Sequence, residues 1–510
     1  MRSVKNFILR YKLESFILIL LLAFFLRFYK VPELFVFSGD EEHQLSIAQT
    51  IVNNFHLEWV GASSADTGFY LGPFWEYFGA LWLFISHSNP LITAYIASFI
   101  GVATTILVYF LGRQIFNRSV AEIAAFLYAT LPLIVYYDRK FWNPALTSFA
   151  SLALFLSLYK TKDSPKWWIL VAFIYGMVFH VHLSLVPLGL VILYWYWKKN
   201  YKLSLKTILA SILVFFVATA PLIGFEYFHN FSNLKTPIRV IGMVVNSPSR
   251  VNPVGHVNQL FKSLGRLWYL SPYRSNSDEV LHSCNPDFTN TKLHVRGVTT
   301  TMSDNKWPLS ILSFGLVFWF LLRRLTWKKE NTRLLALFIS AIGVSYILLP
   351  NTPLEYYLLG IFPLFLYIPG LFYQFLKGSW KKLFIVFLVV ISVFGIFTIL
   401  TAKNNYGLSA KRKLIEGVTN FVRDGKYELV AEGLCHKYEG WRFIFNAYGK
   451  KPERGFTDDS LGWLYREEIT NSKVDFKVLI NEIRIDKGVP NGYKEIIRSG
   501  GFEAYIYAQE

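Results

Sequence analysis

Three consecutive carboxylates are the side chains of this sequence best suited to chemistry. Asp40, Glu41 and Glu42 follow closely on the apolar run at residues 16–28, so they lie at the edge of a membrane if that run crosses one. A carboxylate near hydrocarbon is costly and adjacent carboxylates repel one another, which raises at least one pKa towards the range useful for proton transfer. The cluster is therefore either an ordinary hydrated loop or a site of acid–base chemistry.

A second polar cluster lies in a short connection between two apolar runs. It contains Asp138, Arg139, Lys140 and Asn143. A guanidinium at the level of the lipid headgroups is shaped to bind a lipid phosphate with two hydrogen bonds, and a neighbouring lysine adds positive charge. Arg139 and Lys140 are therefore candidate phosphate ligands. The alternative is that Arg139 pairs with Asp138 or with a lipid headgroup and has no further role.

Two more groups join this list of candidate substrate contacts. His180 and His182 either form local hydrogen bonds at a helix turn or help to hold a phosphate or an acceptor. Their His-x-His spacing binds zinc only with a third ligand, and no residue is nominated for that place. Glu355 and Tyr356 suit a belt of aromatic residues at the membrane interface as well as they suit a substrate contact. We expect neither a metal nor a cofactor.

The composition describes a membrane protein with many spans. Of the 510 residues, 53% are hydrophobic and 18% aromatic, and the mean hydropathy is +0.34, which excludes an ordinary soluble protein. The formal net charge of +18 comes from Lys and Arg residues gathered in short loops between apolar runs. This pattern is typical of cytoplasmic loops and argues against a nucleic-acid partner.

Counting apolar runs gives about eleven transmembrane helices. The first lacks a small-residue cleavage site, so we expect it to stay in the protein as an uncleaved span. We find no internal repeat of the transporter type. The runs occupy residues 16–28, 91–111, 120–137, 144–158, 167–179, 183–197, 208–225, 307–322, 334–349, 356–373 and 383–401.

Orientation and domain boundaries follow from this count. With the basic loops inside, the polar clusters all face outward. Residues 1–401 form the expected membrane domain, with a first outer loop at 29–90 and a large outer loop at 226–306. Within the first loop, residues 42–55 and 70–85 are expected to be helices that lie at the interface rather than cross.

Residues 402–510 are expected to form a small α/β domain outside the membrane. Residues 409–423 suit a helix, and short strands are expected at residues 428–431, 476–480 and 504–507. The basic residues Lys403 and Lys411 to Lys413 instead favour an inside location. The two cysteines, Cys284 and Cys435, both fall outside in this topology, where either a single bridge or two unrelated free thiols fits.

The sequence resembles the GT-C superfamily of membrane glycosyltransferases. The likeness rests on the acidic pair after the first span, on Gly72-Pro73-Phe74-Trp75-Glu76-Tyr77, and on the stretch Tyr137-Asp138-Arg139 after the third span. It is strongest with glycosyltransferase family 39, the dolichyl-phosphate-mannose protein mannosyltransferase-like group, which is also similar to the aminoarabinose lipid A transferases. The resemblance covers residues 16 to about 201 and thins beyond them.

The resemblance implies a GT-C fold and a reaction at the outer face of the plasma membrane. The family's Asp-Glu pair falls on Asp40 and Glu41, which implies Asp40 as catalytic base, and its arginine falls on Arg139, which implies contact with a lipid phosphate. Where many members carry Pro-Asp, this chain has Asn143-Pro144, so Asp138 or Glu42 would have to replace that carboxylate. The implied activity is inverting transfer of a sugar from a polyprenyl-phosphate donor to an acceptor hydroxyl, without a metal.

Two other readings of the same features remain open. A flippase for lipid-linked saccharides would place charges or helix breaks near the middle of the bilayer, whereas these acids stand at its rim. A saccharide polymerase or ligase would share the fold and differ in its donor. The acceptor is a glycan, a lipid or a protein, and neither it nor the sugar follows from the sequence.

Overall fold

The computed structural model describes most of the chain. The predictions for Cys284 and Cys435 fall outside the described residues. The described ranges are 14–64, 68–246, 252–268, 292–295, 298–301, 307–349, 354–432, 440–455, 470–483 and 490–509.

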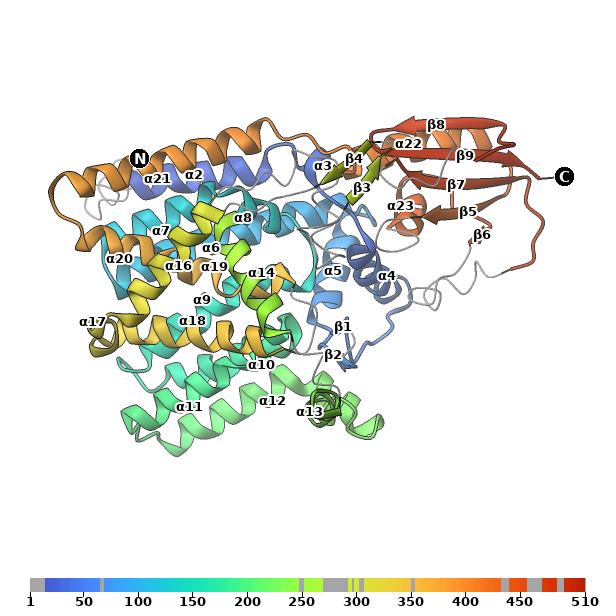
Figure 1. Cartoon of the computed structure of the whole chain (residues 1–510). Coiled ribbons are helices and arrows are strands. Elements are labelled where there is room, and N and C mark those ends of the chain that lie inside the picture. The colour runs from blue at the N-terminus through green and yellow to red at the C-terminus, as the bar shows by residue number, and fades with distance from the viewer. Residues whose placement is uncertain are drawn as a thin grey trace, which may run out of the picture.

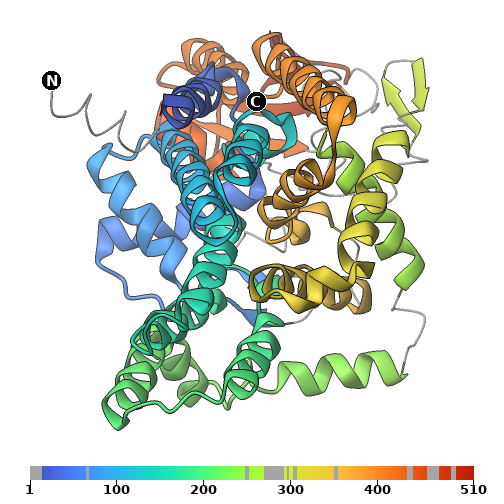
Figure 2. The same ribbon diagram turned by 90° about the vertical axis from the view of Figure 1, so that its left-hand side faces the viewer.

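A bundle of helices that lie side by side makes up most of the molecule (Figure 1), and Figure 2 looks along the bundle. Its interior is one large cluster of buried apolar side chains. The helices of its first part are α2 (Glu14–Phe28), α6 (Leu91–Ile115), α7 (Arg118–Thr130), α8 (Pro132–Tyr137), α9 (Thr147–Lys160), α10 (Trp167–Val181), α11 (Leu188–Lys199) and α12 (Leu205–Phe228). Those of its second part are α16 (Trp307–Leu322), α17 (Arg324–Lys328), α18 (Glu330–Leu348), α19 (Phe362–Phe365), α20 (Tyr367–Phe375) and α21 (Gly378–Leu400).

Each predicted span coincides with one of these helices or with two consecutive ones. Among the described residues, four helices are long and apolar enough on their own to cross a membrane: α6, α12, α18 and α21. Helix α12 shows why, because only 22% of its most apolar stretch is buried inside the molecule. Apolar side chains left exposed along such a length suit lipid rather than water. The total number of crossings stays a prediction.

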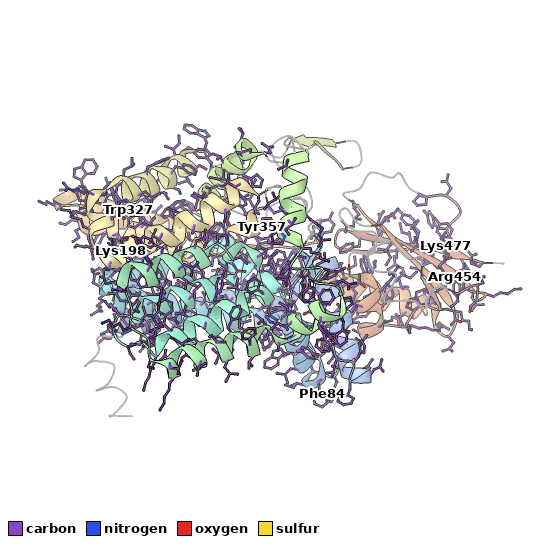
Figure 3. The ribbon with its side chains drawn as sticks, turned by 90° about the horizontal axis from the view of Figure 1, so that it is seen from below. Phe84, Lys198, Trp327, Tyr357, Arg454 and Lys477 are labelled. Carbon is purple, nitrogen blue, oxygen red and sulfur yellow. The ribbon has the colours of Figure 1, made fainter. Side chains whose placement is uncertain are left out.

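Basic loops and the α/β part of the chain lie at opposite ends of the bundle. Lys198 and Trp327 mark the loop end in Figure 3, and Arg454 and Lys477 mark the other. Lys199 pairs there with Glu330, and the guanidinium of Arg333 lies over the ring of Trp195. This separation agrees with the asymmetry that the charge pattern predicts.

The first outer loop forms short elements at the α/β end of the bundle (Figure 1). They are α3 (Val31–Leu34), α4 (Gly39–Asn54), the strand pair β1 (Ser63–Ser64) and β2 (Phe69–Tyr70), and α5 (Phe74–Ile85). Helix α4 begins where Ser38 and Glu41 form a capping box, which satisfies N–H groups that a helix start leaves unpaired. Helix α5 begins after Gly72-Pro73, four residues later than expected, because proline suits the start of a helix.

The large outer loop also contains regular structure. Its elements are α13 (Thr236–Asn246), α14 (Pro253–Arg266) and the antiparallel pair β3 (Lys292–Val295) and β4 (Val298–Thr301). Among the described residues, three short 3-10 turns lie between helices of the bundle: η2 (Asn143–Leu146), η3 (Leu183–Leu185) and η5 (Glu355–Leu358).

The C-terminal part forms an α/β unit. Its strands β5 (Tyr427–Glu432), β6 (Arg454–Gly455), β7 (Phe476–Glu482), β8 (Glu495–Ser499) and β9 (Phe502–Ala508) make one sheet in the order β6-β5-β7-β9-β8. The β5 strand runs parallel to β6 and β7, whereas β9 runs antiparallel to β7 and β8. Helices α22 (Leu408–Val422) and α23 (Trp441–Tyr448) accompany the sheet. Buried side chains of this unit and of the first outer loop form one shared apolar cluster.

Candidate active site

Asp40 stands in the first turn of α4 with its side chain exposed to solvent. It forms no hydrogen bond or ion pair with any residue that the structure describes. The adjacent Glu41 is fully buried, and its carboxylate accepts hydrogen bonds from the backbone N–H of Ser38 at 3.0 Å and from its hydroxyl at 2.5 Å. Glu41 thus builds the turn, and Asp40 is the carboxylate that the turn presents.

Burial raises the pKa of Glu41 above its ordinary value of 4.5, and the positive charge of Lys140 opposes that rise. The interaction shows that Lys140 lies near this turn although it comes from a distant part of the chain. Its ammonium sits 4.3 Å from the ring centre of Trp142, a cation–π distance. Lys140 is buried, and no described residue forms an ion pair with it.

Tyr356 lies near both Trp142 and Asp40. Its ring centre lies 4.7 Å from that of Trp142, and the charge of Asp40 acts on its phenol. Tyr356 belongs to η5, which follows α18, so three separate parts of the chain meet here. We refer to Asp40, Lys140, Trp142 and Tyr356 as the site cluster.

His182 lies beside the site cluster. Its ring centre is 5.8 Å from that of Tyr356 and 5.1 Å from that of Tyr357. Burial lowers the pKa of His182 to about 4, so the ring is neutral at pH 7. Because Nδ1 accepts from the backbone N–H of Ser184 at 3.2 Å, the ring proton belongs on Nε2. His182 therefore offers an N–H donor without a positive charge.

Asn143 fixes the neighbouring backbone. Its amide donates to the carbonyl of Val181 at 2.9 Å, and its oxygen accepts from Gln44 of α4 at 3.0 Å. The amide therefore links α4 to the end of α10. It holds the helix that carries Asp40 against the turn that carries His182.

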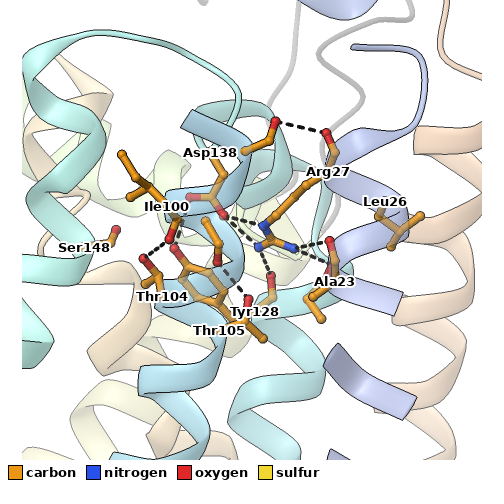
Figure 4. A network of polar contacts seen from close by, with 12 residues as sticks. Ala23, Leu26, Arg27, Ile100, Thr104, Thr105, Tyr128, Asp138 and Ser148 are labelled. Atoms are coloured by element: carbon orange, nitrogen blue, oxygen red, sulfur yellow. Dashed lines mark hydrogen bonds and ion pairs between the residues drawn. The ribbon is translucent and has the colours of Figure 1, made fainter. Parts of the chain in front are cut away.

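Asp138 and Arg139 face away from the site cluster towards α2. Asp138 forms a buried ion pair with Arg27 at 2.7 Å and accepts from the hydroxyl of Tyr128 at 3.1 Å (Figure 4). Arg139 donates to the carbonyls of Leu26, of Arg27 at 3.2 Å and of Tyr29 at 2.9 Å. The last carbonyls of a helix lack partners within it, so these two side chains anchor the end of the first span.

Three other predicted contacts also have protein partners. Glu42 accepts from the backbone N–H groups of Gly440 and Phe443 in the α/β unit. His180 lies within α10, and its Nε2 contacts the carbonyl of Ala218 on α12 at 2.7 Å. Glu355 is fully buried, pairs with Arg266 at 2.7 Å and accepts from the hydroxyl of Tyr137 at 3.0 Å.

An apolar cavity of about 340 Å³ adjoins the site cluster. It is walled by residues of α10, α13, α18 and η3, and His182 and Tyr357 stand where it meets the cluster. Figure 3 labels Tyr357 within the bundle, on the side of the α/β unit. The cavity is lined by Phe69, Phe179, Val186, Val240, Tyr346 and Leu349, among others.

Sequence reasoning missed Trp142, Gln44 and Arg266. Trp142 stands between two nominated residues, Lys140 and Asn143, so its position was a usable signal. Gln44 follows the acidic run by two residues. Arg266 carries no such signal, because it meets Glu355 only through a contact that spans 89 residues.

Comparisons with known proteins concern the family and the fold of the chain. Residues 71–225 match the family model described as dolichyl-phosphate-mannose-protein mannosyltransferase. The crystal structure of ArnT from Cupriavidus metallidurans bound to undecaprenyl phosphate has a TM-score of 0.56 at 10% identity, with 97% of this chain and 98% of that chain covered. The apo form of ArnT gives 0.57 at 10% identity over 96% and 97%.

The oligosaccharyltransferase of Archaeoglobus fulgidus in complex with Zn and sulfate is also similar, with a TM-score of 0.49 at 11% identity over 92% of this chain and 68% of that chain. No curated protein sequence matches the chain. The match over residues 71–225 and the fold shared with ArnT along nearly the whole chain agree with each other. The chain therefore shares the fold of ArnT, and its residues 71–225 resemble the mannosyltransferase family.

Proposed function

We propose that this protein is an inverting glycosyltransferase that moves a sugar from a polyprenyl-phosphate donor to an acceptor hydroxyl at the outer face of the cell membrane. The observation that carries the proposal is the site cluster beside the apolar cavity. Asp40 is an exposed carboxylate and Lys140 an ammonium, and neither has an ionic partner among the described residues. His182, which lies beside Tyr356 of the cluster, also lines the cavity, and that cavity is suited to a hydrocarbon chain. The acceptor is a glycan, a lipid or a protein.

In this reaction Asp40 acts as general base. It takes the proton of the acceptor hydroxyl while the hydroxyl oxygen forms a bond to the anomeric carbon, and the bond from that carbon to the donor phosphate breaks. The displacement inverts the anomeric centre. The departing lipid phosphate is a stable anion and needs no proton. It needs positive charge and hydrogen-bond donors where its own charge grows.

Lys140 and the Nε2–H of His182 are suited to that task. Both lie on the donor side, because Lys140 packs on Trp142 and His182 stands at the mouth of the cavity. Arg139 is engaged by the carbonyls at the end of α2, so we assign it the task of holding the turn that presents Lys140.

The cavity is the proposed place of the first prenyl units of the donor. Its lining is almost wholly apolar, and burial of such a chain against apolar side chains is favourable. The structure of ArnT bound to undecaprenyl phosphate has the same fold and supports a donor of this class. Thr236, Pro237 and Val240 of the large outer loop form one wall, so movement of α13 would open or close the cavity.

Transfer of labelled sugar in proteoliposomes tests the proposal. Wild type, Asp40→Asn and Glu33→Gln are each supplied with a panel of polyprenyl-phosphate monosaccharides, and labelled product and lipid are followed over time. Glu33 is a matched control because it is an exposed carboxylate a few residues before Asp40. We expect transfer by wild type and by Glu33→Gln, with a loss of at least about 100-fold in Asp40→Asn while donor binding persists.

Two results would overturn the proposal. Wild-type rates in Asp40→Asn would remove Asp40 as base. Failure of wild type to transfer from any donor, with labelled lipid appearing in the opposite leaflet instead, would identify a flippase.

A further inference from the structure

We infer that the α/β unit is a positioning element of the active site, which holds residues 35–42 and thereby sets the place of Asp40. The inference rests on the proposed function for its effect on rate. Its structural basis is independent of that function, because it consists of contacts between two parts of the chain far apart in sequence.

Glu42 is the centre of this contact. Its carboxylate is fully buried, and each of its oxygens accepts one backbone N–H at the start of α23: Oε2 from Gly440 at 3.2 Å and Oε1 from Phe443 at 2.9 Å. The first N–H groups of a helix have no partners within it and attract a negative charge. Glu42, two residues from Asp40, is thus hydrogen-bonded to the α/β unit.

Backbone contacts hold the residues that precede Asp40. The N–H of Leu408 donates to the carbonyl of Phe35 at 2.8 Å. The ammonium of Lys411 donates to the carbonyl of Phe37 at 2.9 Å. The ring of Phe37 stacks on that of Phe443 with 5.6 Å between their centres. The α/β unit therefore contacts this segment on both sides of Asp40.

Among the described residues, Asp40 has no hydrogen-bond or ion-pair partner that could fix its side chain. It forms no hydrogen bond with a described residue, so the backbone of its turn alone decides where its carboxylate lies. A displacement of about 1 Å at a reacting group lowers a rate by about 100-fold. Loss of the contact through Glu42 is therefore expected to slow the chemical step rather than donor binding, which takes place at Lys140 and the cavity.

Glu42→Ala tests the inference, with Tyr448→Phe as the matched control. Tyr448 lies at the other end of α23, and its hydroxyl donates to Asn89 at 2.7 Å, so it joins the same helix to the bundle without touching residues 35–42. We expect Glu42→Ala to lower kcat about tenfold or more and leave the KM for the donor within about twofold. Glu42→Gln, which keeps one accepting oxygen, should recover part of kcat, and Tyr448→Phe should match wild type.

Hydrogen–deuterium exchange of residues 35–42 gives a second readout that needs no substrate. Exchange should rise in Glu42→Ala and stay at the wild-type level in Tyr448→Phe. If the alanine variant does not fold, Lys411→Met removes the hydrogen bond to Phe37 while it keeps apolar packing on Trp441, and the same two changes are expected. If wild type transferred no sugar, the proposed function would fail. Hydrogen–deuterium exchange would still show whether the α/β unit holds residues 35–42.

Unchanged exchange in Glu42→Ala would overturn the inference. A wild-type kcat in Glu42→Ala would overturn it as well. So would an equal fall in kcat in Tyr448→Phe, because the general docking of the α/β unit, and not the contact through Glu42, would then be the cause.

Discussion

Arg139 and Lys140 are adjacent cations with different surroundings. The guanidinium of Arg139 donates to backbone carbonyls at the end of α2, whereas the ammonium of Lys140 lies over the ring of Trp142 within the site cluster. The sequence predicted a cationic pair at this turn. It could not show which member binds the backbone carbonyls, because that depends on where α2 ends relative to the turn.

Variants of this pair should therefore fail in different ways. Arg139→Lys keeps the charge but leaves buried carbonyls unpaired, at a cost of about 1–3 kcal/mol each, so we expect a lower Tm and a normal donor KM in the folded fraction. Lys140→Met should keep the Tm and lower kcat about 100-fold. Thermal unfolding and transfer kinetics in the same detergent measure both. A normal Tm with a raised donor KM in Arg139→Lys would instead indicate direct contact with phosphate.

Residue types at the ends of apolar runs nominated Asp40 and several residues that the structure places near it; their roles stay predictions. Asp40, Lys140, Asn143, His182 and Tyr356 were nominated because polar side chains at the ends of apolar runs converge on one face. Glu41 and Glu42 were nominated with Asp40, yet the structure uses one to build the turn and the other to hold the α/β unit. Adjacent carboxylates on a helix point in different directions, and only their partners distinguish them.

At the scale of elements, helix α5 carries a buried acid outside the proposed site. Glu76 is almost fully buried, and a Cβ at Gly61 would lie only 2.4 Å from its Oε2, so its carboxyl group fills the space beside the strand pair β1 and β2. Burial raises the pKa of Glu76 from 4.5 to about 7. The folded protein thus keeps a proton here that the unfolded chain releases at lower pH.

The sign of the pH effect follows. Between pH 4.5 and 7 the folded state binds more protons than the unfolded state, so this group's contribution to stability falls as pH rises, by about 3 kcal/mol in all. Glu76→Gln should remove this pH dependence of stability, so its stability should exceed that of wild type by the largest amount at pH 8. Thermal unfolding of both proteins from pH 5 to 8 measures it, with Glu33→Gln as the exposed control. Parallel curves for wild type and Glu76→Gln would contradict the prediction.

Element boundaries were predictable where local chemistry sets them. The helix at 409–423 and the strands at 428–431, 476–480 and 504–507 all coincide with α22, β5, β7 and β9. The sequence analysis did not identify α23 or β8. Helix α23 has only eight residues, and isolated helices of that length are marginal, so tertiary contacts, among them the carboxylate of Glu42, stabilise it.

At the scale of the whole molecule, the α/β unit is joined to the bundle by a common core. Phe35, Phe37 and Leu45 of the first outer loop belong to the same buried cluster as Leu414 and Phe443 of the unit. Apolar periodicity reports the buried face of each element, but it does not say which distant face covers it. The sequence therefore predicted the unit as a separate domain, whereas the shared core implies that the two parts stabilise each other.

A pair of glycines tests that coupling. Gly440 and Gly492 have nearly the same left-handed backbone, with φ of +85° and +80°, so alanine costs each about 1 kcal/mol of backbone strain. A Cβ at Gly440 would also lie 2.6 Å from Cδ1 of Phe37, whereas one at Gly492 would meet nothing within 4 Å. We expect Gly440→Ala to lose about 1–3 kcal/mol more free energy of unfolding than Gly492→Ala. It should also lower the transfer rate, because the junction shifts. Thermal unfolding and transfer kinetics compare the two variants. Equal losses of stability and of rate would mean that the junction accommodates the extra Cβ and does not hold the segment that carries Asp40.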